Sequence, residues 1–302
     1  MSSTFRAAVV TDPGRPDAVS VVDVPVVPLG PGQVRIAVAA ATVNPVDVVV
    51  RDGVLHQAGI IDQPEHTGLG WDFAGTVLEA GPDVGLAPGT RVAGLVGGFD
   101  RDFGTYAEQL VLPAAAVAVV PDGLGLVEAA TVPLNALTAL QLVDILGDGQ
   151  GRSLLVTGAA GAVGGYVVPF ALERGWRVTG LARAADEEFV RGFGAGFTSE
   201  PVTGWDAVAD GAVLQQEAVA LVRDGGRFVG VQPSFTPAAE RGVSIEAVSV
   251  VPDGAALAGL LERTASGELP ARVAEVLPLD RVDEAHAAVA KGGVRGRYVL
   301  VP

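Results

Sequence analysis

Residues 153–166 of the chain are SLLVTGAAGAVGGY, and this stretch decides the fold around it. Residues 154–156 form a short apolar run that is typical of a buried parallel strand. Small residues follow, then an apolar segment with helical spacing, and then a second apolar run at 176–181. The order strand, glycine-rich turn, helix and strand predicts a βαβ unit, which is the context that makes a glycine motif informative.

The glycine-rich turn has the spacing of a dinucleotide-binding loop. Ala159, Gly161 and Gly164 occupy the three positions of G-x-G-x-x-G, with Ala in place of the first Gly, and Ala162 and Val163 lie between the last two. A pyrophosphate binds well at a helix N-terminus, where free N–H groups and the helix dipole point outward. Gly161 would permit close approach, and Gly164 would permit tight helix–strand packing. The alternative is that small residues only let a helix pack on the sheet.

Charge and length bound the possible functions. The 302 residues include 20 Lys and Arg against 35 Asp and Glu, so the net charge is −15. With no basic patch in the sequence, nucleic acid and an anionic membrane surface are not expected as partners. Apolar residues make up 49% of the chain, which supports two domains with sizeable cores.

The chain has no cysteine, which excludes disulfides and any Cys-based zinc or iron–sulfur site. Its three histidines (His56, His66 and His286) have no metal-ligand spacing, and we expect each in a loop or at the surface. No signal peptide is visible, and no apolar run reaches the roughly 18 residues of a membrane span. We therefore expect a soluble, cytoplasmic protein without a metal.

Two patterns of secondary structure follow one another along the chain. Over roughly the first 120 residues, short strands separated by Pro and Gly predict a β-rich domain. Helical periodicity then covers 126–146, with an interruption at Pro133, and strands and helices alternate from 153 onward. This alternation predicts a doubly wound α/β domain with a parallel sheet. Further strands are expected at 5–11, 19–24, 33–42, 70–77, 91–96, 206–210, 226–231, 274–278 and 297–301, and helices at 214–222, 254–266 and 282–291.

Two acids of the β-rich part are conspicuous. Asp47 ends the turn Asn44-Pro45-Val46-Asp47, where Pro fixes the backbone and an acid in the first turn of a helix can cap it. Asp72 is isolated within the apolar run 70–77, and such an acid is usually paired or hydrogen-bonded.

Seven motifs occur in one order along nearly the whole chain: NPVD at 44–47, GWDFAG at 70–75, GTYAE at 104–108, AATVPLNALTAL at 129–140, GAAGAVGG at 158–165, VRDGGRFVGV at 222–231, and EAH with GGVRGRYVLV within 284–301. Together they resemble the zinc-free, quinone oxidoreductase-like branch of the medium-chain dehydrogenase/reductase superfamily.

This resemblance implies a fold in two parts. A GroES-like catalytic domain would comprise 1–120, completed by 270–302, and a Rossmann-type NADP-binding domain would comprise 121–269, with the active site in the cleft between them. It also implies a homodimer formed through a strand edge, for which 243–251 is the candidate. Zinc-dependent members carry ligands at positions that here are Asn44 and 70–72, and their Cys₄ lobe is missing.

The resemblance further implies hydride transfer from the nicotinamide to a quinone or an α,β-unsaturated carbonyl. Asn44 is the candidate donor to the acceptor oxygen. Asp47 is the second residue of the catalytic set, expected to orient the turn. Thr138 resembles the residue near the nicotinamide end of the cofactor, and Val231 completes the cofactor set.

Arg183 favours NADP over NAD. NAD enzymes place an acid about 20 residues after the glycines, at the end of the second strand. Here that strand ends without an acid, and Arg183 could hold a 2′-phosphate. Acids at 186–188 stand where relatives often carry Lys, and the alternative for Arg183 is a solvated surface charge.

The candidate substrate region departs from the relatives. They often have tyrosines after N-P-x-D, where this chain has Val49 and Leu55, so a Tyr general acid is absent and quinone reduction with protons from water is favoured. Val48 and Trp71 add apolar surface that suits a small hydrophobic carbonyl or quinone substrate. The missing tyrosines leave open a second class, a non-redox cyclase or ligand-binding protein of the same fold.

Overall fold

The computed structural model describes residues 4–15 and 17–302, which fall into two compact units. One unit holds the described residues up to Leu134 together with Val251–Pro302, and the other is Asn135–Val250. The sequence predicts changes of domain near 120 and 270. In the structure, α3 (Leu126–Ala130) packs on β3 and β5, and α8 (Gly254–Ala265) packs on β8, so both helices lie with the β-rich unit.

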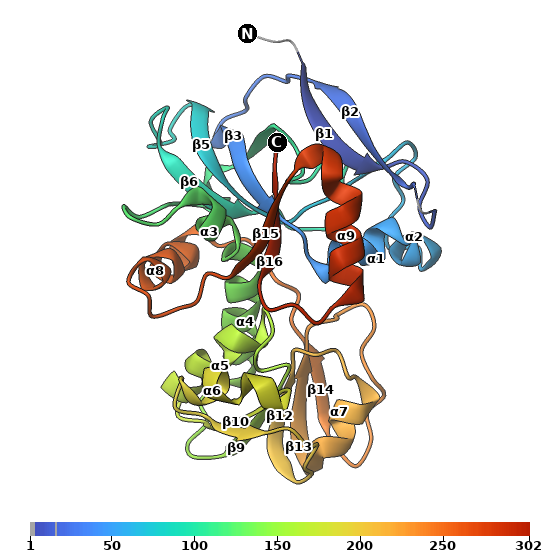
Figure 1. Ribbon diagram of the computed structural model, residues 1–302, viewed down its shortest axis with the longest axis vertical. Coiled ribbons are helices and arrows are strands. Elements are labelled where there is room, and N and C mark those ends of the chain that lie inside the picture. The colour runs from blue at the N-terminus through green and yellow to red at the C-terminus, as the bar shows by residue number, and fades with distance from the viewer. Residues whose placement is uncertain (1–3, 16) are drawn as a thin grey trace. The chain divides into compact units, whose positions relative to one another are not determined.

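The first unit is built mainly of antiparallel strands (Figure 1). Its strands are β1 (Thr4–Val10), β2 (Val19–Pro25), β3 (Gln33–Thr42), β4 (Thr67–Gly68), β5 (Asp72–Ala80), β6 (Arg91–Leu95), β7 (Gln109–Pro113), β8 (Val117–Val119), β15 (Val273–Pro278) and β16 (Arg297–Val301). One sheet has the order β2-β1-β4, and a second has the order β15-β16-β3-β5-β6-β8, with β7 also paired to β3. The strands predicted for this part of the chain are confirmed, including the C-terminal pair.

The remaining elements of the first unit are α1 (Pro45–Arg51), α2 (Val54–Gln57), α9 (Val282–Lys291) and the 3₁₀ turns η1 (Ala114–Ala116) and η3 (Leu279–Arg281). Helix α1 begins with Pro45 at its first position, and Asn44 and Asp47 form a capping box. The predicted helix start at this turn is therefore confirmed. Helix α8 is capped by Asp253, whose carboxylate accepts from the Ala256 amide at 2.9 Å.

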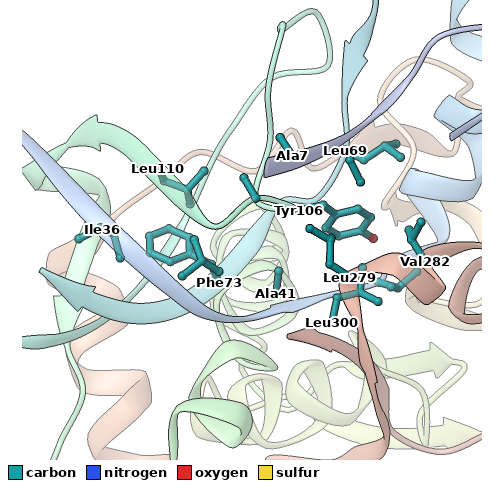
Figure 2. Close-up of a cluster of buried hydrophobic side chains, with 14 of the residues drawn as sticks. Ala7, Ile36, Ala41, Leu69, Phe73, Tyr106, Leu110, Leu279, Val282 and Leu300 are labelled. Carbon is teal, nitrogen blue, oxygen red and sulfur yellow. The ribbon is translucent and has the colours of Figure 1, made fainter. Parts of the chain in front are cut away.

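The core of the first unit joins its sheets to α9. Figure 2 shows Phe73, Tyr106 and Leu300 with Val282 of α9 in one cluster of buried side chains. His286, one turn after Val282 on the same helix, is completely buried. The expectation that all three histidines lie in loops or at the surface is therefore wrong for His286, because positions 282, 285 and 286 form the buried stripe of an amphipathic helix.

The second unit is a parallel sheet in the order β11-β10-β9-β12-β13-β14. Its elements are α4 (Pro133–Leu146), which begins at the end of the first unit, β9 (Ser153–Thr157), α5 (Gly164–Glu173), β10 (Arg177–Leu181), η2 (Ala184–Asp186), α6 (Glu187–Arg191), β11 (Gly196–Thr198), β12 (Trp205–Asp210), α7 (Gln216–Leu221), β13 (Val222–Gly230) and β14 (Ser244–Ala247). The predicted α/β alternation and the helix break at Pro133 are confirmed. The strand order reverses between β9 and β12, which is where such sheets bind ligands.

The chain passes from β11 to β12 through residues 199–204 without a helix. Strand β14, within the stretch that we expected to form a dimer, is an edge strand of the sheet.

Candidate functional site

The glycine loop joins β9 to α5 in the second unit. Gly158 takes a left-handed conformation, with φ +59°, and its carbonyl accepts from the Gly161 amide at 2.7 Å. A Cβ at position 164 would lie 2.2 Å from the Gly158 carbonyl oxygen, so the tight turn admits only glycine there. The loop thus brings small residues and a helix N-terminus together at the carboxyl end of the first strand, which suits a pyrophosphate.

The structure explains the alanine in the first motif position. Ala159 is fully buried, and its amide donates to the Leu181 carbonyl of β10 at 3.2 Å. A Cβ on Gly180 would come within 2.6 Å of the Ala159 Cβ, so a glycine on the neighbouring strand provides the space for this methyl group. Ala162 and Val163 complete the loop as half-buried residues directly before α5.

Arg183 follows the end of β10 and precedes η2. Its Nε donates to Asp186 Oδ2 at 3.0 Å, and its side chain remains 60% exposed, whereas the Asp186 side chain is buried. Asp186 is one of the three acids at 186–188, which stand where relatives often carry Lys. It therefore orients the guanidinium of Arg183. Glu187 pairs instead with Arg191 on α6 at 2.7 Å.

The other two cofactor candidates also belong to the second unit. Thr138 lies on α4 and is 7% exposed, and Val231 directly follows β13 at the carboxyl end of that strand. The glycine loop, Arg183 and Val231 thus all lie at carboxyl ends of neighbouring or near-neighbouring strands of one parallel sheet.

Asp47 orients the turn of the first unit through hydrogen bonds. Its carboxylate accepts from the backbone amides of Asn44 at 2.9 Å and Gly70 at 2.8 Å, and from the Tyr106 hydroxyl at 3.0 Å. Burial raises the pKa of Asp47 to about 6, although these hydrogen bonds and the charge of Arg101 oppose the shift. Asp47 therefore holds the turn that carries Asn44.

Asn44 is held on both sides of its amide. Its Nδ2 donates to the Thr42 carbonyl at 3.1 Å and to Asp72 Oδ1 at 3.0 Å, and Arg297 donates to its Oδ1. Thr42 also donates to Asp72, and burial raises the pKa of Asp72 against the opposing charge of Arg297. The expectation that Asp72 is hydrogen-bonded is confirmed. Both amide hydrogens of Asn44 have acceptors inside the unit, so donation to a substrate would require one of them to be released.

Two arginines near Asn44 and Asp47 were not among the candidate residues predicted from the sequence. Arg297 bridges Asn44 and the Val43 carbonyl, at 2.7 Å from the latter. Arg101 stacks on Trp71, with its guanidinium carbon 4.7 Å from the ring centroid, and donates to the Val96 carbonyl at 3.1 Å. Burial lowers the pKa of Arg101 to about 10. Arg297 lies in the last of the seven motifs, GGVRGRYVLV, but no spacing in the sequence connects it with Asn44.

A catalytic zinc does not fit the donors of this chain. Cysteine is absent from the sequence, and Asn44 offers an amide that already has partners. Within residues 4–15 and 17–302, no group of three or more His, Asp or Glu side chains is arranged to hold a metal ion. Among these same residues, no helix combines the length and the apolar character that crossing a membrane requires.

The β-rich unit, the parallel-sheet unit and the glycine loop are typical of the dehydrogenase/reductase fold, and comparison with known proteins agrees. The family model "Alcohol dehydrogenase GroES-like domain" matches residues 30–122, and the model "Zinc-binding dehydrogenase" matches residues 184–300. The chain belongs to the medium-chain dehydrogenase/reductase superfamily, in its quinone oxidoreductase and enoyl reductase branch. It is an oxidoreductase of this superfamily, whose members use NAD(P)H.

Three relatives illustrate this placement. The chain is 30% identical to 2-methylene-furan-3-one reductase of Solanum lycopersicum, over 99% of this chain and 80% of that protein. It is 37% identical over 67% of its length to the spectinabilin polyketide synthase system protein NorB of Streptomyces orinoci, of which it spans only 9%. The quinone oxidoreductase structure from Coxiella burnetii superimposes with a TM-score of 0.87 at 25% identity, covering 99% of each chain.

Proposed function

We propose that the protein is a zinc-independent reductase that transfers a hydride from NADPH to a quinone or an α,β-unsaturated carbonyl compound. The observation that carries this proposal is the glycine loop at the N-terminus of α5, with Arg183 at the end of the adjacent strand β10. Two relatives, a 2-methylene-furan-3-one reductase and a quinone oxidoreductase, support these acceptor classes by their names.

The proposed cofactor site lies in the second unit. The loop of Ala159, Gly161, Ala162, Val163 and Gly164 would bind the pyrophosphate through its small residues and the helix N-terminus. When bound, NADPH supplies the hydride.

The groups around the loop would bind the two ends of the cofactor. Arg183, oriented by Asp186, would hold the 2′-phosphate. Thr138 and Val231 would contact the nicotinamide side.

The proposed role of the first unit is to position the acceptor. Asn44 would donate to the acceptor oxygen by exchanging one of its present bonds, and Asp47 would hold the turn that carries Asn44. The positions of the relatives' tyrosines are Val49, which is half-buried, and Leu55, which belongs to the core. The proton that accompanies the hydride would therefore come from water, giving a hydroquinone or a saturated carbonyl compound.

Titration of NADPH and of NADH into the purified protein tests the cofactor, and loss of nicotinamide absorbance with 9,10-phenanthrenequinone or a methylene-furanone tests the reaction. We expect tighter binding of NADPH and its oxidation by at least one of these acceptors. Binding without oxidation of any quinone or enone would instead favour the non-redox alternative. Absence of binding would refute the cofactor assignment.

We also propose that the protein forms a homodimer through the free edge of β14 (Ser244–Ala247). Ile245 and Glu246 lie at the centre of this strand. Ile245→Pro would remove an edge N–H, and sedimentation should then show a monomer, whereas an unchanged mass would refute this interface.

A further inference from the structure

The loop between β12 and α7 is strained next to the glycine loop. Val213 and Gln215 both have left-handed φ values, +59° and +56°, although neither is a glycine, and the ψ of Gln215 is −117°. A β-branched residue such as Val is an outlier in this region of φ. Strained residues persist only where surrounding contacts hold them, and they cluster at ligand sites.

A buried carboxylate imposes this conformation. Asp210, at the end of β12, is 1% exposed and accepts from the Leu214 amide at 3.1 Å and the Gln215 amide at 2.8 Å. It also accepts from the Thr157 hydroxyl of β9 at 2.6 Å, and Thr157 in turn accepts from the Ala212 amide at 3.1 Å. The ends of two adjacent strands thus determine the course of the loop.

The side chain of Gln215 extends this connection to a third strand. Its Nε2 donates to Gln232 Oε1 at 2.7 Å and to the Phe235 carbonyl at 2.7 Å. Gln232 comes two residues after the end of β13. We call this set of contacts among Gln215, Gln232 and the Phe235 carbonyl the amide clamp.

The strained loop packs directly on the glycine loop. A Cβ on Gly158 would lie 3.2 Å from Ala212, and a Cβ on Gly211 would lie 3.4 Å from the Gly164 amide nitrogen. The strands β12 and β13, both labelled in Figure 1, lie on one side of β9, and β10 with Arg183 lies on the other side. A dinucleotide that crossed this switch point with its adenosine half over β10 would have its nicotinamide half over β12 and β13.

We propose that Asp210 and Gln215 are positioning residues for the nicotinamide half of the cofactor. Asp210 sets the backbone of 211–215 against the glycine loop, and the amide clamp holds Gln232 at the end of β13 beside it. This inference rests on the proposed NADPH-binding function, and it concerns one half of the cofactor only. A ligand that contains only the adenosine half therefore distinguishes this positioning role from a general structural role.

The test compares two ligands, NADPH and 2′,5′-ADP, which contains the adenosine and 2′-phosphate but no nicotinamide. The main variant is Gln215→Gly, which removes the clamp and also relieves the backbone strain, so the thermal midpoint should not fall. Gln232→Leu breaks the clamp without touching the loop backbone. The matched control is Gln216→Ala. Gln216 is the next residue at the start of the same helix, and its side chain bonds the amide and the carbonyl of Ala238 outside the clamp.

For both clamp variants we expect NADPH to bind about tenfold more weakly, and kcat to fall, while the affinity for 2′,5′-ADP changes less than about twofold. The control should bind both ligands as the unmodified protein does. Unchanged NADPH affinity in both clamp variants, or an equal loss for the two ligands, would overturn the positioning role. Failure of the unmodified protein to bind either ligand would instead overturn the proposed function, and this inference with it.

Discussion

Replacing His286 by leucine should make the protein more resistant to acid. His286 lies on α9 with no exposed surface, and its ring meets that of Tyr106 edge to face, with centroids 5.9 Å apart. Among the residues that the structure describes, neither ring nitrogen has a hydrogen-bond partner. Burial, together with the charge of Arg51, lowers the pKa of His286 to about 3, and the opposing charge of Asp52 only partly offsets this.

The expected effect follows from proton linkage. In the unfolded chain the imidazole titrates near its ordinary pKa of 6.5, so between that value and about 3 the unfolded state binds a proton that the folded state does not. The free energy of unfolding therefore falls as the pH falls through this range. Near pH 5 the loss from His286 alone is about 2 kcal/mol relative to near pH 7.5.

Urea denaturation of both proteins at the two pH values measures this difference. Between them, the free energy of unfolding of the unmodified protein should fall by about 2 kcal/mol more than that of His286→Leu. Asp47, whose pKa in the folded state is raised to about 6, acts in the opposite direction, because its contribution to the free energy of unfolding is lost as the pH rises. This contribution is the same in both proteins and cancels in the comparison.

Val282→Ala on the same helix is the matched control, since it removes buried methyl groups without a titrating group. It should lower the free energy of unfolding equally at both pH values. Parallel acid losses in the unmodified protein and in His286→Leu would show that His286 is not held neutral in the fold, and would refute the reasoning.

Three further substitutions test the sites. Gly161→Val should weaken NADPH binding at least about tenfold by keeping the pyrophosphate from the loop backbone, and calorimetry showing unchanged affinity would contradict the loop assignment. Arg183→Ala should weaken NADPH about tenfold or more and NADH little, so equal losses in a paired titration would remove the 2′-phosphate role. Tyr106→Phe deletes the hydroxyl that donates to buried Asp47 and should cost about 1–3 kcal/mol in urea denaturation, whereas an unchanged midpoint would show that the bond contributes nothing.

The parts of the fold that sequence could predict are those with local causes. The βαβ unit around Gly161 and the helix start at Asn44 each depend on residues within one turn or one strand of each other. The acceptance of Ala at position 159 depends instead on Gly180 of the next strand, and no pattern within the motif shows this. The burial of His286 did leave a signal, its place on the apolar stripe of α9, which outweighs the usual preference of histidine for the surface.

The polar networks could be predicted only in part. An acid inside the apolar run at Asp72 indicated a buried partner, because an unpaired carboxylate there would be too costly. Its side-chain partners are Thr42 and Asn44, and the amide oxygen of Asn44 in turn accepts from Arg297, which is separated from Asn44 by 253 positions. Only the closing of β16 onto β3 brings these groups together, so their identity is a consequence of the tertiary fold.

Asn44 has a physical role that is independent of any part in the reaction. Its backbone amide bonds Asp47, and its side chain lies between the carboxylate of Asp72 and the guanidinium of Arg297, so it links two buried acids to one buried cation. A neutral amide suits this position because it donates to the anion and accepts from the cation at once. An acid would add a third buried negative charge, and an apolar residue would remove one hydrogen bond from each of the two partners. These bonds hold the turn together, and one of them would be exchanged if Asn44 donated to a substrate. Losses of activity measured on replacing Asn44 therefore have to be compared with the losses of stability before any of them is assigned to catalysis.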